Sequence, residues 1–271
     1  ALDSPADLYI AHYSPALPAA ARAAARHGAL YAFDAEDFHP GDLPDEESNG
    51  LYNRTLDALE RRLLPGCAYV SAASPGIADL YRKTYCIASP TVLLNVFPRA
   101  SAPASATPAG VVSPGPSIYW YSQIIGPKRG LECVVRALPL MQSGPHLYLR
   151  GVARESFVNE LKGIARDLGV EDRLHVLPPA MPDHLERLAS EYDIGISPEL
   201  GDTRNHRVAL GNKLFSYLIA GLPIVATNIP GHAELAAQLT GAMTLFPQDD
   251  HRMLAAEIDA ILCSRERLRA S

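Results

Sequence analysis

The sequence has little cysteine, and its cysteines form no regular pattern. Four occur among 271 residues, none in a Cys-x-x-Cys spacing: Cys67, Cys86, Cys133 and Cys263. Zinc sites and the disulfide frameworks of small secreted proteins need close or regular cysteine spacing, so the pattern excludes both. We therefore expect a reducing, cytoplasmic location.

Long apolar runs and a surplus of positive charge are also absent. No stretch approaches the roughly 20 apolar residues that span a bilayer, and no signal-peptide pattern opens the sequence. The net charge is -6, whereas nucleic-acid binding calls for clustered Lys and Arg. The nearest basic run is Arg265, Arg267 and Arg269, a solvated helix end or an electrostatic aid at a membrane surface. We expect a protein that is soluble or at most peripheral to the membrane, with no nucleic-acid partner.

A proline-rich stretch divides the chain. Residues 97–117 contain five prolines and a single charged residue, Arg99. Such a composition packs poorly and gives a stiff connection, so the domain boundary is expected inside it. We expect an N-terminal domain of residues 1–98, a linker of residues 99–116 and a C-terminal domain of residues 117–271.

Both halves alternate short apolar runs with helical periods. After the linker, six strands are expected at residues 117–121, 146–150, 174–177, 194–197, 224–226 and 243–246. Strand–helix units in such a series predict a parallel sheet covered on both faces. The first half has the same rhythm with four strands, at residues 8–11, 29–33, 69–72 and 91–94, which make half of a doubly wound domain.

Two loops of the second half are candidates for ligand binding, because ligands bind beyond the carboxyl ends of parallel strands. The loop of residues 122–130 carries Lys128 and Arg129 just before a helix, which suits a diphosphate or is simply a solvated turn. The loop of residues 197–213 is long and polar, which is typical of functional loops. Its Glu199 could accept two hydroxyls of a ribose or sugar ring, or be a solvated loop carboxylate. Lys213 stands at the positive end of a helix, where a bound anion would explain it.

The second half resembles a known family. Asn212-Lys213-Leu214-Phe215, the stretch of residues 220–226 and the stretch of residues 126–131 are similar to motifs of the family-4 glycosyltransferases. The resemblance implies a B-type α/β fold, in which two Rossmann-like domains face a cleft. It covers most of the chain, but the first domain enters partway through the family pattern, so we expect that domain to be incomplete.

The resemblance also implies the donor site. In such enzymes the C-terminal domain holds the nucleotide sugar, with an Arg and a Lys on its diphosphate. Here Arg129 corresponds to the lysine and Gln123 replaces the arginine. Val208 and Ser216 stand where the family has two glutamates, the second of which contacts the ribose. The expected donor-binding residues are Gln123, Lys128, Arg129, Gly130, Gly151, Gly211, Asn212, Lys213 and Ser216.

On the acceptor side, His12 matches a family histidine that faces the donor sugar, and we take His12 and Glu199 as candidate catalytic residues. A lone histidine at a strand end is more often structural. Asp34, Glu36 and Asp37 form a carboxylate cluster that would receive a hydroxylated acceptor or cap a turn. No metal is expected, because enzymes of this fold oppose the diphosphate with cations and helix dipoles.

The resemblance implies a retaining, metal-independent glycosyltransferase without cofactor, acting from a nucleotide diphosphate sugar on a hydroxyl acceptor. The acceptor would be a saccharide or a lipid-linked sugar, in the synthesis of cell-surface polysaccharide or glycoconjugate. A nucleotide-binding module without catalysis is the alternative that Gln123 and Ser216 favour. A sugar-nucleotide epimerase would need an acid and a base beside the sugar, which the sequence does not clearly supply.

Overall fold

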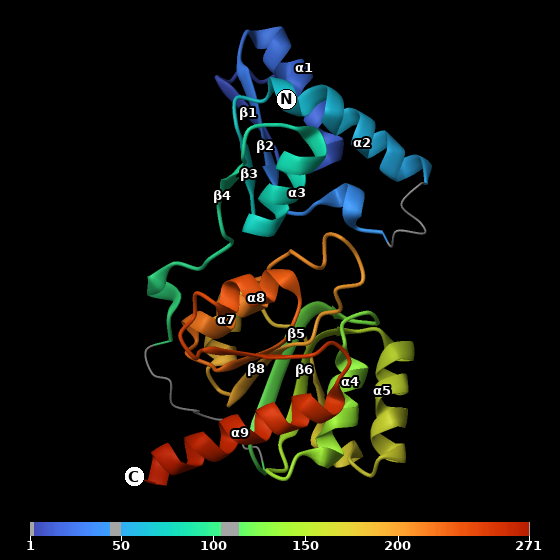
Figure 1. Ribbon diagram of the computed structural model, residues 1–271, viewed down its shortest axis with the longest axis vertical. Coiled ribbons are helices and arrows are strands. Elements are labelled where there is room, and N and C mark those ends of the chain that lie inside the picture. Colours follow the sequence, from blue (N-terminus) through green and yellow to red (C-terminus); the bar gives the residue numbers. More distant parts are fainter. Residues whose placement is uncertain (1–2, 44–49, 104–113, 271) are drawn as a thin grey trace. The chain divides into compact units, whose positions relative to one another are not determined.

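The structure is a computed structural model that describes residues 3–43, 50–103 and 114–270 (Figure 1). Residues 104–113 of the expected linker, and the side chains of Arg265, Arg267 and Arg269, lie outside the described part. The chain forms two compact units. Unit 1 consists of Ala1–Asn95 together with Gly201–Leu210, and unit 2 of Val96–Leu200 together with Gly211–Ser271. The first unit is therefore discontinuous in sequence, which the expected domain ranges did not include.

Unit 1 is a four-stranded parallel sheet in the order β1-β2-β3-β4. Its strands are β1 (Leu8–Ala11), β2 (Leu30–Ala35), β3 (Val70–Ala72) and β4 (Thr91–Val92), and its helices are α1 (Leu17–His27), α2 (Leu51–Leu63) and α3 (Pro75–Tyr85). Each strand pairs with the next along the chain, so right-handed crossovers place successive helices on the same face. Figure 1 shows α1, α2 and α3 to one side of these strands.

Burial in unit 1 follows from this one-sided cover. Tyr9 and Ala11 of β1 are buried, whereas Leu8 and Ile10, which point to the opposite face, are exposed. One hydrophobic cluster joins the buried residues of β1 and β2 to those of α1 and α3. Local signals set the helix ends: Ser74 caps α3 by accepting a hydrogen bond from the Ile77 amide at 3.1 Å, and α1 ends at Gly28 in the left-handed region.

Unit 2 is a six-stranded parallel sheet in the order β10-β9-β8-β5-β6-β7. The sheet grows one way from β5 to β7 and the other way from β8 to β10, so crossover helices cover both faces. Its strands are β5 (Ser117–Ile125), β6 (His146–Ala153), β7 (Leu174–Leu177), β8 (Ile194–Ser197), β9 (Ile224–Thr227) and β10 (Met243–Phe246). Its helices are α4 (Leu131–Ala137), α5 (Glu155–Asp167), α6 (Leu185–Ala189), α7 (Asn212–Ile219), α8 (Pro230–Ala236) and α9 (His251–Ala270).

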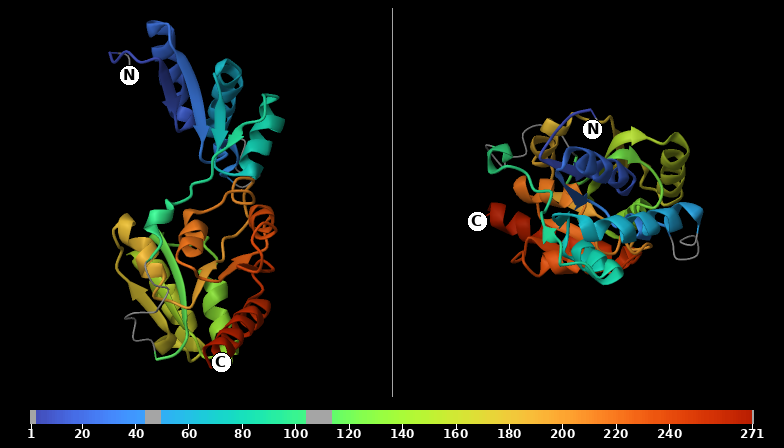
Figure 2. Two further views of the ribbon diagram at one scale, coloured as in Figure 1. Left: turned by 90° about the vertical axis from the view of Figure 1, so that its left-hand side faces the viewer. Right: turned by 90° about the horizontal axis from the view of Figure 1, so that it is seen from above.

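The main core of unit 2 lies between the sheet and α4, α5 and α9. Ile118 and Trp120 of β5 are fully buried there, with Leu147 of β6 and Ile258 of α9. Figure 2 shows α9 beside α4, with which it is in contact. Figure 1 shows α7 and α8 on the other side of the sheet from α4 and α5, so both faces of this sheet are covered.

The expected strands agree with the structure except at some ends. The strands at residues 8–11, 174–177, 194–197 and 243–246 have the expected bounds, whereas β4 is shorter and β2 lies slightly further on. The largest difference is β5, which continues to Ile125 through a register shift between Tyr121 and Ile124. Gln123 therefore lies in a strand rather than in the loop where we expected it. Among the described helices, none is long and apolar enough to cross a membrane.

Candidate functional site

The site of unit 2 is set by the place where the strand order reverses. β5 and β8 are neighbours, and the chain leaves them toward opposite edges of the sheet. The loops after two such strands diverge and leave a crevice outside their carboxyl ends. The loop after β5 carries Lys128 and Arg129, and the loop after β8 carries Glu199. Both loops that the sequence singled out therefore start at this point of the sheet.

Glycines allow the neighbouring backbones to approach each other there. Gly130 has a φ of +69°, and a Cβ atom added to it would lie 1.9 Å from the carbonyl oxygen of Pro198. Gly151 has a φ of +154°, and its added Cβ would lie 2.4 Å from the carbonyl oxygen of Ser122. Larger residues would push these strand ends apart. Both glycines, which we expected at the donor site, thus shape it through the backbone.

A buried ion pair lies at the start of α7. The ammonium of Lys213 donates to the carboxylate of Glu199, which also accepts a hydrogen bond from the Ser197 hydroxyl. Burial alone would raise the pKa of Glu199, but the charge of Lys213 and the two hydrogen bonds outweigh it and hold that pKa well below its ordinary value. Glu199 is therefore ionised at neutral pH and balances Lys213. Glu199 and Lys213, for which the sequence predicted different roles, therefore form a single ion pair.

Neighbouring side chains enclose this pair. The Nζ atom of Lys213 lies 5.7 Å from the ring centroid of Trp120, close enough for a cation–π contact. His232 is buried and donates from Nδ1 to the carbonyl of Thr227 at 2.8 Å. Burial lowers the pKa of His232, although Glu199 acts in the opposite direction. The imidazole is thus neutral at neutral pH and adds no charge beside the pair.

Ser216 lies deeper than the expected ribose contact would suggest. Its side chain is fully buried, and its hydroxyl accepts a hydrogen bond from the Tyr121 hydroxyl at 2.6 Å. Burial raises the pKa of Tyr121 to about 12 even though the bond to Ser216 lowers it. The position that carries a glutamate in the resembling family therefore holds a neutral pair between α7 and β5.

The remaining donor-side candidates are accessible to solvent. Lys128 and Arg129 are exposed, and within the described residues neither forms an ion pair. Lys128 adopts a φ of +62°, which is uncommon for a residue with a side chain. Gly211 and Asn212 are exposed at the start of α7, and no side chain caps that helix. Its first amide groups, together with the two exposed cations, are features that bind anions.

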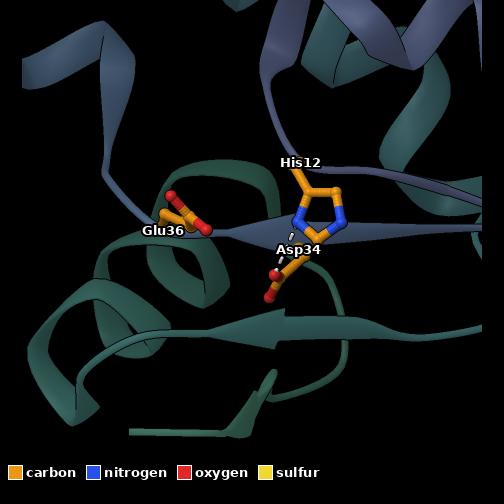
Figure 3. A group of neighbouring side chains, drawn as sticks. All are labelled: His12, Asp34 and Glu36. Carbon is orange, nitrogen blue, oxygen red and sulfur yellow. Dashed lines mark hydrogen bonds and ion pairs between the residues drawn. The ribbon is translucent and has the colours of Figure 1, made fainter. Parts of the chain in front are cut away.

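Unit 1 brings three of the other candidates together (Figure 3). His12, just beyond β1, forms a hydrogen bond between its Nδ1 atom and Oδ2 of Asp34 on β2, at 3.0 Å. The hydroxyl of Ser71 on β3 donates to Oδ1 of Asp34 at 2.6 Å. Glu36 lies nearby, with one potential ligand atom of each of His12, Asp34 and Glu36 within 4.8 Å of the others. This geometry is compatible with a metal ion, so the expected absence of metal stays a prediction.

Asp37, the third carboxylate of the expected acceptor cluster, points to a different partner. Asn205 donates through Nδ2 to Asp37 at 2.8 Å and to Asp42 at 2.7 Å, and its Oδ1 accepts from the Phe38 amide at 2.8 Å. Asn205 is buried, and it belongs to the segment of residues 201–210 that completes unit 1. The sequence did not predict this role of Asn205, for which the length of the loop after β8 is the only signal.

A doubly wound parallel sheet with cations and an uncapped helix start at its switch point defines unit 2 as a Rossmann-like ligand-binding domain. Two sequence family models match the chain. The sequence model described as "Glycosyl transferases group 1" matches residues 115–264, and the one described as "Glycosyl transferase 4-like domain" matches residues 1–95. The chain belongs to the group 1 glycosyltransferases, and it is a glycosyltransferase.

Solved structures agree with this fold. HepE of Anabaena in complex with UDP and glucose has a TM-score of 0.72 at 18% identity, over 94% of this chain and 68% of that chain. A glycosyltransferase of Rickettsia africae gives 0.72 at 17% identity, over 95% and 66%. Sucrose-phosphate synthase of Thermosynechococcus elongatus gives 0.69 at 16% identity, over 95% and 64%. Among curated proteins none matches the chain. The expected fold, with two Rossmann-like domains of the B type, is confirmed.

Proposed function

We propose that the chain transfers a sugar from a nucleotide diphosphate sugar to a hydroxyl acceptor, with retention at the anomeric carbon and without a metal ion. One observation carries the proposal: a buried lysine, Lys213, lies in the first turn of α7, a helix without a side-chain cap at the switch point of unit 2. A cation is unfavourable at the positive end of a helix unless an anion is bound there. Glu199 supplies that negative charge in the free protein, and a diphosphate would supply it in the complex.

The charges around the site suit a leaving diphosphate. In the free protein Glu199 balances Lys213 and His232 is neutral, so positive charge is offered by Lys128, Arg129 and the amide groups of α7. Lys213 joins them when a diphosphate replaces Glu199 as its partner. Negative charge that develops on the diphosphate as the glycosidic bond breaks is stabilised by such fixed donors and cations. HepE, one of the similar structures, has been solved with UDP-glucose, which supports a nucleotide sugar as donor for this chain.

The acceptor and the setting are the finer part of the proposal. We propose a saccharide or a lipid-linked sugar as acceptor, received beside Asp34 and Glu36 of unit 1, with His12 as the catalytic residue of that group. Structural neighbours include a lipopolysaccharide outer core galactosyltransferase, which supports a role in cell-surface polysaccharide. We place that reaction in the cytoplasm, at or near the membrane surface.

The test is a binding and turnover panel on the purified chain. Thermal shift with UDP, GDP, ADP and their glucose or mannose conjugates identifies the donor, since binding raises the melting temperature by mass action. Calorimetry on Arg129→Ala and Lys213→Ala should then show losses of about 1.5 to 3 kcal/mol in nucleotide affinity, as expected for charge-assisted contacts. Lys162→Ala, an exposed lysine of α5, is the control. If both site variants keep full affinity, the diphosphate site is wrong.

A chelator arm tests the metal-independent mechanism. Because fixed cations oppose the diphosphate, treatment with EDTA should change neither donor affinity nor turnover. Activity that is lost with EDTA and restored by magnesium or manganese would contradict the proposal.

A binding module without catalysis is the second candidate. It is favoured by the neutral Tyr121–Ser216 pair, which stands where the resembling family has a carboxylate on the donor. Nucleotide binding without any hydrolysis or transfer of the donor sugar would support this alternative.

A further inference from the structure

Three hydrogen-bonding residues form a row across the sheet of unit 1. Asp34 and Ser71 are register partners on β2 and β3, and His12 follows Ala11, the register partner of Phe33, so it lies next to Asp34. In a parallel sheet register partners point to the same face. The row lies on the face opposite the hydrophobic cluster with α1 and α3, near the carboxyl ends of the strands.

The two bonds of Asp34 constrain the ring of His12. A carboxylate has only acceptors, so the Nδ1 atom of His12 must carry the hydrogen of the 3.0 Å bond. The Nε2 atom then has its lone pair free when the ring is neutral, and it lies on the side of the ring away from Asp34 (Figure 3). The hydroxyl of Ser71, which is buried, holds the other oxygen of Asp34 in place.

The His12 side chain is more exposed to solvent than the Asp34 side chain, so the bond between them constrains the His12 ring. The side chain of His12 is 62% exposed and that of Asp34 is 26% exposed. An exposed ring would otherwise sample several rotamers and both tautomers, and a reacting group gains rate when its orientation is fixed beforehand. The bond to Asp34 supplies that constraint from the more buried side.

We propose that Asp34 is a positioning residue: it fixes the tautomer and orientation of His12 so that Nε2 is presented to a sugar hydroxyl received at this face of unit 1. The inference rests on the proposed function for the role of His12, but the tautomer itself does not depend on that role. Glu36 forms no hydrogen bond to His12 among the described residues, so of the two carboxylates grouped with His12 only Asp34 sets the orientation of the ring.

The direct test is nitrogen-15 NMR of the His12 ring in protein treated with chelator, which removes any metal bound to the cluster. At a pH at which the spectrum shows the neutral ring, the hydrogen should be on Nδ1 in the unaltered protein. In Asp34→Ala it should move to Nε2, and in Ser71→Ala the two forms should be mixed. Asp57→Ala, which removes a carboxylate paired with Arg61 on α2, should leave the ring unchanged. A His12 tautomer that is the same in Asp34→Ala would overturn the proposal.

Kinetics then test the consequence. Asp34→Ala should lower kcat for donor turnover by roughly 10- to 100-fold, the scale of a misplaced catalytic group, with little change in KM for the donor. In the His12→Ala background the same substitution should have no further effect, because residues that act through one another are not additive. A full loss in that background would mean that Asp34 acts by itself and would overturn the positioning role. If no variant and no donor gives turnover, the proposed function fails while the NMR result still decides the tautomer.

Discussion

The two sheets of this chain follow the same handedness rule and yet are covered differently. In unit 1 the strand order follows the chain, so every right-handed crossover returns on the same face. In unit 2 the order reverses between β5 and β8, and helices lie on both faces. Leu8, Ile10, Leu30 and Tyr69 of unit 1 consequently remain between 37% and 61% exposed, although parallel sheets are usually buried on both sides.

The difference explains where each unit carries its polar groups. Unit 2 has a switch point, and its Glu199–Lys213 pair and exposed cations lie at the loops that diverge there. Unit 1 has no reversal among its described strands, and its His12 row lies on the face without the helical layer. The order of strands, rather than the residues alone, decides which kind of site each sheet can offer.

The difference in burial between the two sheets can be tested by replacing one isoleucine of each sheet with alanine. Ile118→Ala in the covered sheet should cost about 2 to 5 kcal/mol in free energy of unfolding, the usual range for a buried side chain. Ile10→Ala, on the face of the unit 1 sheet that carries no helices (the bare face), should change the free energy of unfolding by no more than about 0.5 kcal/mol. Ile118 is fully buried, whereas Ile10 is 45% exposed. Hydrogen exchange of the amides of each unit measures both values. Equal costs would mean that the bare face is covered in solution.

The second test removes the charge balance of unit 2. Lys213→Met should cost roughly 3 kcal/mol, because it leaves Glu199 enclosed without its counter-charge. Adding Glu199→Gln should restore most of the loss, since the double variant has no unpaired charge. Lys162→Met is the control on the exposed surface of the same unit. Urea unfolding followed by the fluorescence of Trp120, the single tryptophan, reports on unit 2. A double variant as unstable as Lys213→Met would show that the pair is not balanced as described.

The third test separates backbone strain from a steric clash, with one glycine in each unit. Gly28→Ala, at a φ of +64° with nothing within 4 Å of the added Cβ, should cost about 1 kcal/mol from conformation alone. Gly130→Ala has similar strain and also meets the carbonyl of Pro198 at 1.9 Å, so we expect about 2 to 3 kcal/mol. Thermal unfolding of both variants checks the difference. Equal shifts would show that the two loops separate easily.

The smallest effects should come from pH, and they should have opposite signs in the two units. Burial raises the pKa of Glu60 in unit 1, although hydrogen bonds from Ser14 and Tyr81 act the other way. The contribution of Glu60 to the free energy of unfolding is therefore present below the ordinary pKa of a glutamate. It is lost as the pH rises through the pKa that Glu60 has in the folded protein. The pKa of Glu199 in unit 2 is lowered, so its contribution is present above the ordinary value and is lost on acidification.

Glu60→Gln and Glu199→Gln measure these two slopes. Relative to the unaltered protein, Glu60→Gln should become more stable as the pH is raised from 4 to 8, by on the order of 1 kcal/mol for each unit of pKa shift. Glu199→Gln should become relatively less stable over the same range. Urea unfolding at a series of pH values gives both slopes. Slopes of the same sign would contradict the assigned burial and charge environments.

The sequence predicted the sheets better than it predicted the partners of single residues. Apolar runs identified strands such as Ile194–Ser197 and Ile224–Thr227, which are buried at every position, because a strand buried on both faces is largely apolar. Lys213 was recognised as unfavourably placed at a helix start, which is a local property. Its partner Glu199 and the bond of Ser216 to Tyr121, 95 positions away in the chain, depend on tertiary packing, which periodicity and composition do not encode.

The discontinuity of unit 1 has a consequence for how such a protein can be recombined. Asn205 fills a polar recess of unit 1, and Val208 lies so close to Gly76 that an added Cβ would meet it at 2.5 Å. A single genetic crossover in the proline-rich stretch would combine the first half of one parent with residues 201–210 of the other parent, although both parts belong to unit 1. Exchange between homologues should therefore succeed more often when residues 201–210 are inherited with the first half, which makes the natural unit of inheritance two separate stretches of gene.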